Sequence, residues 1–491
     1  MTSPASSAPT LKRDLGLRIA FAVVVGNVIG SGIFLKPGTI AAASGNFWLI
    51  ITVWVLGGVL CLLGALCFAE LATLYPRAGG MYVYLREAYG KLVAFLFGWT
   101  ETVFGKPAAI GALAVAFVAK LNILLSPVDR PFLSANGQVG VAIAAIALLA
   151  WINILGVVWG GRMQLLTTII KAGFLALVGV LPFLLIPFVS NAARFENYQT
   201  TVTPDNASLA AQMGTVLLAV MWAYNGWHGI TPLAEEVRQP QRNLPIALFG
   251  GIGILIVLYV TANFAYHGVL SMDEMKAAGQ DAAENTLLRL LGPWGSAAMS
   301  AVIMCSVFGA INSNLLQAPR VTYAMGRDQV FFRGLGQVHA NYRTPVAAIV
   351  LMAGMAIGLV LAAALSKSLV QGVDARAFSA EIVRRIIQSL QDGSIFDLLT
   401  NFVIFSASIF YVLAVTAVVV LRWRQPESER PYRTWGYPIT PILFLGVYCW
   451  FLDQVLRSNP LESYVGLAFI AIGVPFYFGY RLWNADSAGT K

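Results

Sequence analysis

Twelve long apolar segments divide this 491-residue chain, and each is long enough to cross a lipid bilayer as an α-helix. Hydrophobic residues make up 58% of the sequence, and charged residues make up 11%, against about 25% in soluble domains. We therefore predict an all-α polytopic membrane protein. The predicted spans are 17–43, 47–74, 92–124, 138–157, 163–189, 210–234, 245–270, 295–325, 344–366, 395–422, 438–457 and 463–483.

Lysine and arginine are unevenly distributed between alternate connections. If the N-terminus is cytoplasmic, the inner segments hold about twice as many of these residues as the outer ones. The positive-inside rule then predicts a multi-pass protein of the cell membrane with both termini in the cytoplasm. The net charge of +9 forms no basic stripe with interleaved aromatics, so lipid is an expected partner and nucleic acid is not.

Two of the apolar segments contain residues that favour a break in the helix. Gly30-Ser31-Gly32 interrupts the first segment, and Ala223-Tyr224-Asn225-Gly226 interrupts the sixth. Unwound backbone at membrane depth is tolerated only where it is buried in protein or lines a cavity. A pair of broken helices in corresponding positions is typical of a transporter's substrate site, although small residues alone also favour close helix packing. The N–H groups of the first break suit a carboxylate.

A lysine lies near the middle of the fifth segment. Lys171 is about 12 Å along the helix from its start, near the bilayer midplane. Gln164, Thr167, Thr168 and Lys171 form one polar stripe, which we expect to face the bundle interior. A buried ammonium must find carbonyl or hydroxyl oxygens or release its proton, so Lys171 is predicted to be a structural cation or a proton carrier.

Other polar residues in the spans give weaker signals. Glu101 and Lys106 lie five positions apart, and we expect them to pair locally or with a polar face of the seventh segment (Tyr259, Asn263 and Tyr266).

Three carboxylates lie at inner helix ends. Glu70, Glu235 and Glu236 are expected to form inner-gate ion pairs with Arg77 and Arg242.

Other functional classes lack their sequence signatures. There is no repeated filter motif for a channel, no His-rich cluster for a membrane enzyme and no P-loop for ATP-driven transport. The four cysteines show no metal-ligand or disulfide spacing. We therefore expect no catalytic residue, no bound metal and no cofactor.

Short motifs occur in a fixed order over roughly residues 14 to 480. They are Gly26 to Phe34, Glu70-Leu71 with Pro76, Trp99-Thr100-Glu101 with Lys106-Pro107, the run from Glu235 to Pro245, Gly326-Arg327-Asp328, and Arg430-Pro431 with Tyr437-Pro438. This order resembles the amino acid–polyamine–organocation (APC) superfamily, and within it the L-type amino acid transporter (LAT) family. The resemblance implies a LeuT-like fold: two inverted five-helix repeats followed by two C-terminal helices.

The domain boundaries follow from that fold. We expect a disordered cytoplasmic tail over 1–16, a first repeat over 17–189, a second over 210–422, helices 11 and 12 over 438–483, and a cytoplasmic tail over 484–491. An outer insertion over 367–394 interrupts the second repeat. It is predicted either to lie on the membrane as an amphipathic helix or to form a solvated helical loop.

The resemblance also implies a substrate site. Gly30, Ser31 and Gly32 would hold the α-carboxylate of an amino acid, and freed carbonyls of Ile29 and of the sixth helix would hold the α-ammonium. The predicted substrate-binding residues are Ile29, Gly30, Ser31, Gly32, Ile33, Trp222, Ala223, Tyr224, Asn225 and Gly226.

Three positions in the sixth helix bear on substrate choice. Trp222 matches the position of a family aromatic that closes over substrate, although packing alone also accounts for a tryptophan there. Asn225 and His228 stand where the family commonly has Gly and Asn. The preferred substrate side chain and the role of His228 therefore stay open.

The resemblance places Lys171 where sodium-coupled relatives bind Na⁺, between helices 1, 5 and 8, with Ser306 as a neighbour. It implies alternating access by a sodium-independent exchanger of neutral L-amino acids, the alternative being a proton-coupled symporter. Eukaryotic L-type relatives join a glycoprotein through a cysteine in an outer connection. Residues 126–137 contain none, so no disulfide-linked heavy subunit is expected.

Overall fold

The protein is a bundle of membrane-length helices. A computed structural model describes residues 9–125, 132–189, 192–204, 208–370, 373–374, 383–384, 387–388, 395–458 and 460–489. In these ranges, eleven helices are long and apolar enough to cross a membrane. A shorter apolar helix, α10 (Leu209–Tyr224), matches the remaining predicted span. The all-α polytopic fold is confirmed.

The elements follow one another without a strand in the described ranges. They begin with α1 (Leu17–Val28), α2 (Gly32–Leu35), α3 (Pro37–Ser44), α4 (Phe47–Leu74), α5 (Met81–Tyr89), α6 (Lys91–Trp99), the π-helical turn η1 (Thr100–Gly105), α7 (Lys106–Leu125), α8 (Ala135–Leu155), α9 (Val157–Leu184), η2 (Phe195–Gln199) and α10. They continue with η3 (Thr231–Glu236), α11 (Pro240–Val269), α12 (Met272–Ala278), η4 (Gly279–Asp281), α13 (Ala282–Leu291), α14 (Pro293–Arg327), η5 (Arg333–Gly336), α15 (Val346–Val370), α17 (Ile395–Arg424), α18 (Ile439–Ser458) and α19 (Pro460–Gly489).

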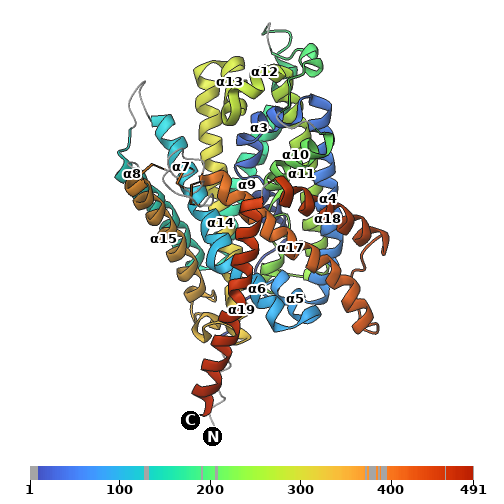
Figure 1. Cartoon of the computed structure of the whole chain (residues 1–491), viewed down its shortest axis with the longest axis vertical. Helices are drawn as coiled ribbons and strands as arrows, with labels where there is room; N and C mark the ends of the chain where they lie inside the picture. Colours follow the sequence, from blue (N-terminus) through green and yellow to red (C-terminus); the bar gives the residue numbers. More distant parts are fainter. Residues whose placement is uncertain are drawn as a thin grey trace.

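The two ends of the bundle differ. At the lower end in Figure 1, which we call the terminal face, lie α5 and the end of α19. At the other end, the opposite face, the short helices α12 and α13 cover the bundle (Figure 1). There α12 packs against α3, and α13 packs against α2.

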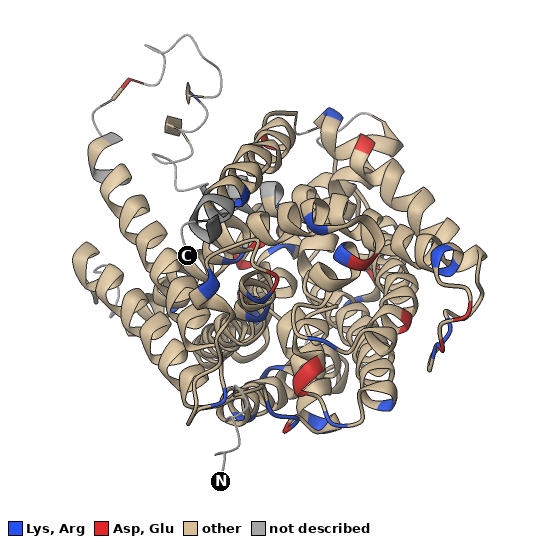
Figure 2. Cartoon of the chain, turned by 90° about the horizontal axis from the view of Figure 1, so that it is seen from below, with Lys and Arg blue, Asp and Glu red and all other residues tan. Residues whose placement is uncertain are grey.

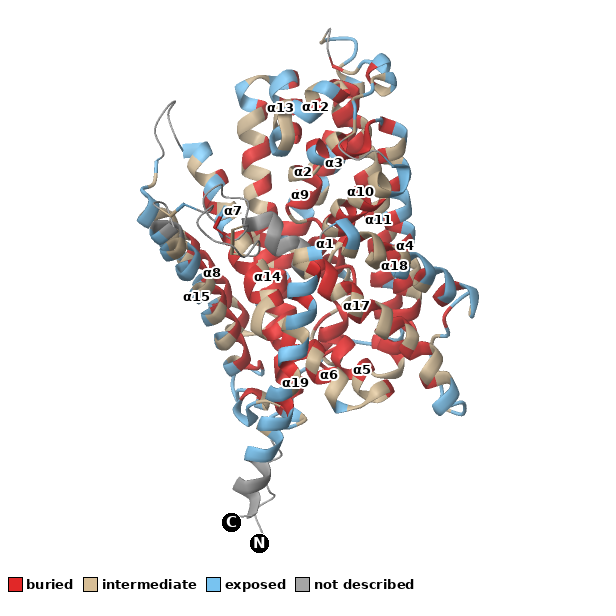
Figure 3. Ribbon diagram, in the orientation of Figure 1, coloured by how far each residue is buried: buried red, intermediate tan, exposed pale blue. Residues whose placement is uncertain are grey.

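Apolar residues occupy both the inside and the outside of the bundle. Buried residues gather along its axis, and exposed ones lie on the outer faces of the helices (Figure 3). Many of the exposed side chains are large and apolar, as expected where lipid replaces water: Trp48, Trp151, Leu166, Ile169, Val257 and Leu443.

The first helix lies deep in the bundle, enclosed by α9, α11 and α14. The predicted polar stripe of α9 faces inward, since Gln164, Thr167, Thr168 and Lys171 are all buried. Asn312 of α14 joins this stripe by donating to the side-chain oxygen of Gln164 at 3.0 Å. Polar contacts therefore fix α9 against α14 beside the first helix.

The described part of the segment before α1 is ordered, whereas disorder was predicted for it, and the last helix runs beyond its predicted end. Leu15 is fully buried, its N–H donates to the Glu236 carbonyl at 2.9 Å, and its carbonyl accepts from the Arg238 N–H. The chain before α1 is therefore docked on the terminal face, because apolar Leu11 and Leu15 are buried there. At the other end α19 runs past residue 483 to Gly489, since no Gly or Pro interrupts 484–488. Residues 1–8, 490–491 and most of the predicted insertion over 367–394 lie outside the described ranges.

Ion pairs close the terminal face, but not with the predicted partners. Glu236 pairs with Arg320, both fully buried, at 2.8 Å. Glu70 pairs with Arg422 at 2.7 Å, and Glu235 pairs with Arg327 at 2.9 Å.

The predicted pairing of these carboxylates with Arg77 and Arg242 is wrong. Arg77 lies instead 3.9 Å from Glu87 of α5. The true partners come from α14 and α17, helices distant in sequence that reach the same face. Figure 2 views the charged residues from this side.

Candidate functional site

The first break is short and leaves polar groups unused. Helix α1 ends at Val28, and α2 begins at Gly32. Within the described chain, the N–H groups of Ser31 and Gly32 donate to no backbone carbonyl. The Ser31 hydroxyl is buried and has no hydrogen-bond partner there. Three donors gathered at one point suit an anionic group.

The second break follows α10 and depends on a glycine. Gly226 has a φ of 94°, a conformation that L-residues with side chains rarely adopt. Its carbonyl accepts a hydrogen bond from Asn27 Nδ2 at 2.8 Å, and a Cβ on Gly226 would overlap that same nitrogen. Glycine is therefore required here both by the backbone and by the contact with α1.

The two breaks touch each other. A Cβ added to Gly32 would overlap the backbone of Ala223, so the first break approaches the second through a residue without a side chain. The Tyr259 hydroxyl of α11 lies 2.9 Å from the Val28 carbonyl and 3.1 Å from the Ala223 carbonyl. One side chain thus bridges the ends of α1 and α10.

A cavity lies where the breaks meet. Both breaks line it together with α7, α14 and α17. Its residues are Asn27, Val28, Gly30, Ser31, Gly32, Gly105, Lys106, Ala109, Leu113, Trp222, Asn225, Gly226, Ala310, Asn314 and Val403.

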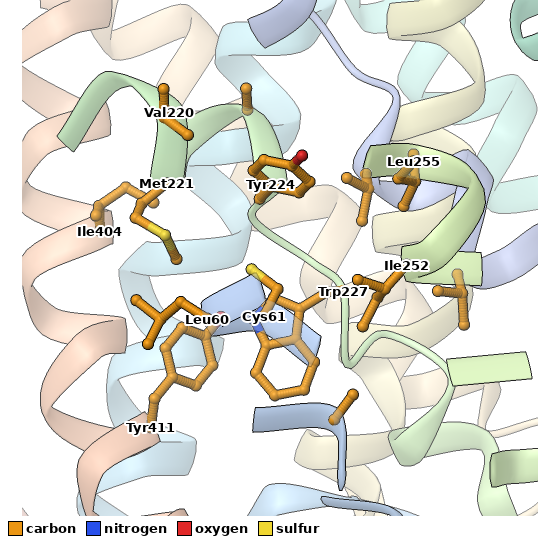
Figure 4. Packing of buried hydrophobic residues seen from close by; sticks show 14 of the residues in the cluster. Leu60, Cys61, Val220, Met221, Tyr224, Trp227, Ile252, Leu255, Ile404 and Tyr411 are labelled. Carbon is orange, nitrogen blue, oxygen red and sulfur yellow. The ribbon is translucent and has the colours of Figure 1, made fainter. Parts of the chain in front are cut away.

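Six of the ten predicted substrate-binding residues line this cavity: Gly30, Ser31, Gly32, Trp222, Asn225 and Gly226. The other four lie behind its wall, buried in the core: Ile29, Ile33, Ala223 and Tyr224. Their side chains belong to the hydrophobic core, and the backbone carbonyls of Ile29 and Ala223 accept hydrogen bonds at the breaks. Figure 4 shows Tyr224 at the end of α10 above Trp227 in this packing.

Lys171 of α9 lies where α1, α9 and α14 meet. Its ammonium donates to the carbonyls of Gly26, of Ile29 at 2.6 Å, and of Ser306 at 3.4 Å. The Ser306 hydroxyl lies 2.9 Å from the carbonyls of both Ile29 and Gly30. Carbonyls freed at the end of α1 are therefore bound by groups from α9 and α14. The Ile29 carbonyl, expected to bind a substrate ammonium, already contacts both side chains.

Lys106 and Glu101 pair with each other, which confirms the first of the two predicted pairings. Their charged atoms are 3.6 Å apart. The turn between them is π-helical, and its i→i+5 repeat brings residues five apart onto one face. The alternative partner Tyr259 contacts backbone carbonyls instead. Lys106 also lines a second, smaller cavity on the terminal side, together with Glu101, His228 and Gln317.

Several residues at the cavity were missed by sequence reasoning. Asn27, Asn314 and Val403 line it, and Tyr411 of α17 contacts Asn225 from behind. The polar residues among them stand out as polar within apolar spans, which could have marked Asn27 and Asn314. No sequence signal relates Tyr411 to the sixth helix, because the two are distant in the chain.

Two discontinuous helices meeting at a cavity inside an all-α bundle define the class of secondary transporters with broken helices. Residues 15–472 match the family described as "Amino acid permease". The chain belongs to this amino acid permease family, and the predicted APC and LAT resemblance is confirmed.

Similar proteins carry related names. The serine/threonine exchanger SteT of Bacillus subtilis (strain 168) is 33% identical over 97% of this chain and 98% of its own. The large neutral amino acids transporter small subunit 2 of Homo sapiens is 30% identical, over 96% of this chain and 81% of its own. Asc-type amino acid transporter 1 of Mus musculus is 28% identical, over 98% and 83%.

Proposed function

We propose that this permease is a sodium-independent exchanger of neutral L-amino acids that works by alternating access. The observation that carries the proposal is Lys171. Three carbonyl oxygens and a hydroxyl gather between α1, α9 and α14, and the Lys171 ammonium supplies the positive charge among them. A cation attached to the chain removes the need for a dissolved one at this place. The exchanger SteT, similar over nearly the full length, supports exchange.

The substrate α-carboxylate binds at the first break in this proposal. The unused N–H groups of Ser31 and Gly32 and the unpartnered Ser31 hydroxyl are its donors. Gly30 lines the cavity and keeps the approach free of a side chain.

The α-ammonium binds at the second break. The Ile29 and Ala223 carbonyls already accept hydrogen bonds from side chains, whereas the Asn225 carbonyl accepts none from the described residues. Asn225 lines the cavity, so its carbonyl is the ammonium acceptor that we propose. Trp222, on the same wall, closes over the bound substrate.

The proposal keeps the membrane topology and the partners that were predicted from the sequence. Both termini are cytoplasmic, residues 17–189 and 210–422 form the two inverted repeats, and no disulfide-linked subunit is attached. The four cysteines lie in the helices α4, α14 and α18, not in a connection.

If both termini are cytoplasmic, a tag placed after Lys491 should be digested by protease only when the cell membrane is opened.

Uptake into proteoliposomes tests the function. The purified protein is supplied with each of the twenty amino acids, with and without internal amino acid, with Na⁺ or choline outside, and with or without a pH gradient. We expect uptake of neutral amino acids that requires internal amino acid and is the same in choline. Dependence on Na⁺ would overturn the proposal. Accumulation driven by a pH gradient without internal amino acid would instead establish the proton-coupled symporter.

A further inference from the structure

Side chains of the second break, of the turn that follows it and of α17 form a chain of hydrogen bonds. His228 Nε2 lies 2.9 Å from the Tyr411 hydroxyl, and that hydroxyl lies 3.1 Å from Asn225 Oδ1. His228 and Tyr411 are buried, and Tyr411 also packs its ring 5.7 Å from that of Trp227 (Figure 4). Asn225 alone of the three lines the substrate cavity. The chain of bonds therefore runs from the protein interior to the cavity wall.

The direction of these bonds is fixed by their end groups. An amide oxygen can only accept, so the Tyr411 hydroxyl donates its proton to Asn225. The tyrosine oxygen is then free to accept, which makes His228 Nε2 the protonated ring nitrogen. His228 Nδ1 is buried and has no partner among the described residues, as expected for a nitrogen without a proton.

These bonds determine which atom of Asn225 is available at the cavity wall. Because Oδ1 of Asn225 accepts from Tyr411, the side-chain atom of Asn225 that is still available is its amide nitrogen, which can only donate. This nitrogen donates to no group in the part of the chain that the structure describes. The cavity wall also holds the apolar side chains of Ala109, Leu113 and Ala310 and the amides of Asn27 and Asn314. The amide nitrogens of Asn27 and Asn314 already donate to backbone carbonyls. Lys106, also on this wall, is paired with Glu101 at 3.6 Å.

We propose that Asn225 is a specificity-determining residue that donates a hydrogen bond to an acceptor atom on the substrate side chain. Tyr411 and His228 are positioning residues that keep the amide in this orientation. The site then selects hydroxyl and carboxamide side chains over apolar side chains of the same shape. This inference rests on the proposed function.

Threonine and valine provide the sharpest comparison, because they have nearly the same shape and differ by one hydroxyl. The full-length protein in proteoliposomes is given each amino acid, and kcat/KM is measured for both. We expect the wild type to prefer threonine by about tenfold or more, since one hydrogen bond to an otherwise unpaired donor is worth about that much.

Variants of Asn225 test the binding residue itself, and variants of Tyr411 and His228 test the residues that position it. Asn225→Gly should bring the threonine-to-valine ratio of kcat/KM near one, whatever its effect on the overall rate of transport. Tyr411→Phe should lower the ratio several-fold at nearly constant valine transport, and so should His228→Leu. His228→Gln should keep the ratio, because its amide can still donate to Tyr411.

Tyr448→Phe is the matched control. Tyr448 is fully buried, its ring is 6.1 Å from that of Tyr411, and its hydroxyl has no partner among the described residues. Its loss should leave the ratio at the wild-type value.

A wild-type ratio near one, or an unchanged ratio in Asn225→Gly and Tyr411→Phe, would overturn the inference and leave amino acid exchange standing. No uptake of any amino acid by the wild type would overturn the proposed function itself.

Discussion

The two helix breaks that meet at the cavity are held by different means. At the first break, the freed carbonyls of α1 are bound by Lys171 and Ser306, which come from distant helices. At the second, the backbone turns at Gly226, and neutral donors from Asn27 and Tyr259 bind its carbonyls. The first break therefore depends on a charge supplied by the tertiary structure, whereas the second depends on local backbone geometry.

This difference separates two roles. A break held by a charge changes its stability whenever that charge is removed or moved, so the first break is suited to respond to the state of the transporter. A break fixed by a glycine gives the first one a constant surface to close against. Each prediction below tests one side of this contrast.

The largest effect is expected at the second break. Gly226→Ala combines an unfavourable positive φ with overlap on Asn27, so it should destabilise the fold by several kcal/mol. The loss is measured as thermal unfolding of the purified protein in detergent. Gly253→Ala in α11, where nothing lies within 4 Å of the added carbon, is the control and should unfold at or slightly above the wild-type temperature, because alanine favours a helix more than glycine does. Equal unfolding temperatures for both variants would refute the local constraint.

The second-largest effect is expected when the charge at the first break is removed. Lys171→Met removes hydrogen bonds from an ammonium to the Gly26 and Ile29 carbonyls, each worth about 1.5–3 kcal/mol. We expect exchange in proteoliposomes to fall by about tenfold or more. Lys91→Met, at the exposed start of α6, should leave exchange unchanged. If Lys171→Met exchanged amino acids at the wild-type rate, the first break would not depend on this charge.

The two glycines of the first break should respond differently. A Cβ on Gly32 would overlap Ala223, whereas the nearest atoms to a Cβ on Gly30 are 3.9 Å away. Gly32→Ala should therefore lower both stability and transport. Gly30→Ala should keep the unfolding temperature but raise KM by about tenfold, because its methyl group enters the cavity. Similar changes in stability for the two variants would contradict this assignment.

A smaller effect is expected for Trp222, which lines the cavity. Trp222→Ala should reduce transport severalfold while the unfolding temperature falls little, since a residue that closes over substrate is needed mainly in the closed state. Trp423→Ala, 80% exposed at the end of α17, serves as the control. Normal uptake by Trp222→Ala would make this tryptophan a packing residue.

The smallest effect is expected in α12, one of the two short helices that cover the bundle at the opposite face. The pKa of Glu274 in α12 is lowered to about 2, first by its hydrogen bonds with Arg289 and further by Ser271. A carboxylate with a depressed pKa stabilises the fold above its ordinary pKa and loses that contribution as pH falls toward 2. Because the pair is exposed, Glu274→Gln should cost less than about 1 kcal/mol at pH 7. The difference from wild type should vanish near pH 2 in unfolding measurements.

Much of the fold could be predicted from the sequence. Apolar length located the spans, and Gly-rich interruptions located both breaks, because these are local properties of the chain. The inward stripe ending at Lys171 followed from helical periodicity. The contacts of Lys171 with α1 and α14 could be expected only through family resemblance, since they join residues more than one hundred positions apart.

The rest depended on tertiary packing. The covering helices α12 and α13 are short and amphipathic, so an apolar-length criterion does not detect them. Arg422 and Arg320, not Arg77 and Arg242, reach the inner carboxylates because distant helix ends meet there. The bonds from His228 through Tyr411 to Asn225 likewise require α17 to lie beside the second break.

The π-helical turn over Thr100–Gly105 sets the rotational phase between the two halves of the third membrane helix. One residue more than an α-helical turn needs is inserted there, so α7 is rotated by about 100° relative to a continuous α-helix. This rotation lets α6 present one side to α19 while α7 presents another to α14. Deleting a single residue from this turn would shift the phase of the whole of α7 and carry Lys106 away from the cavity.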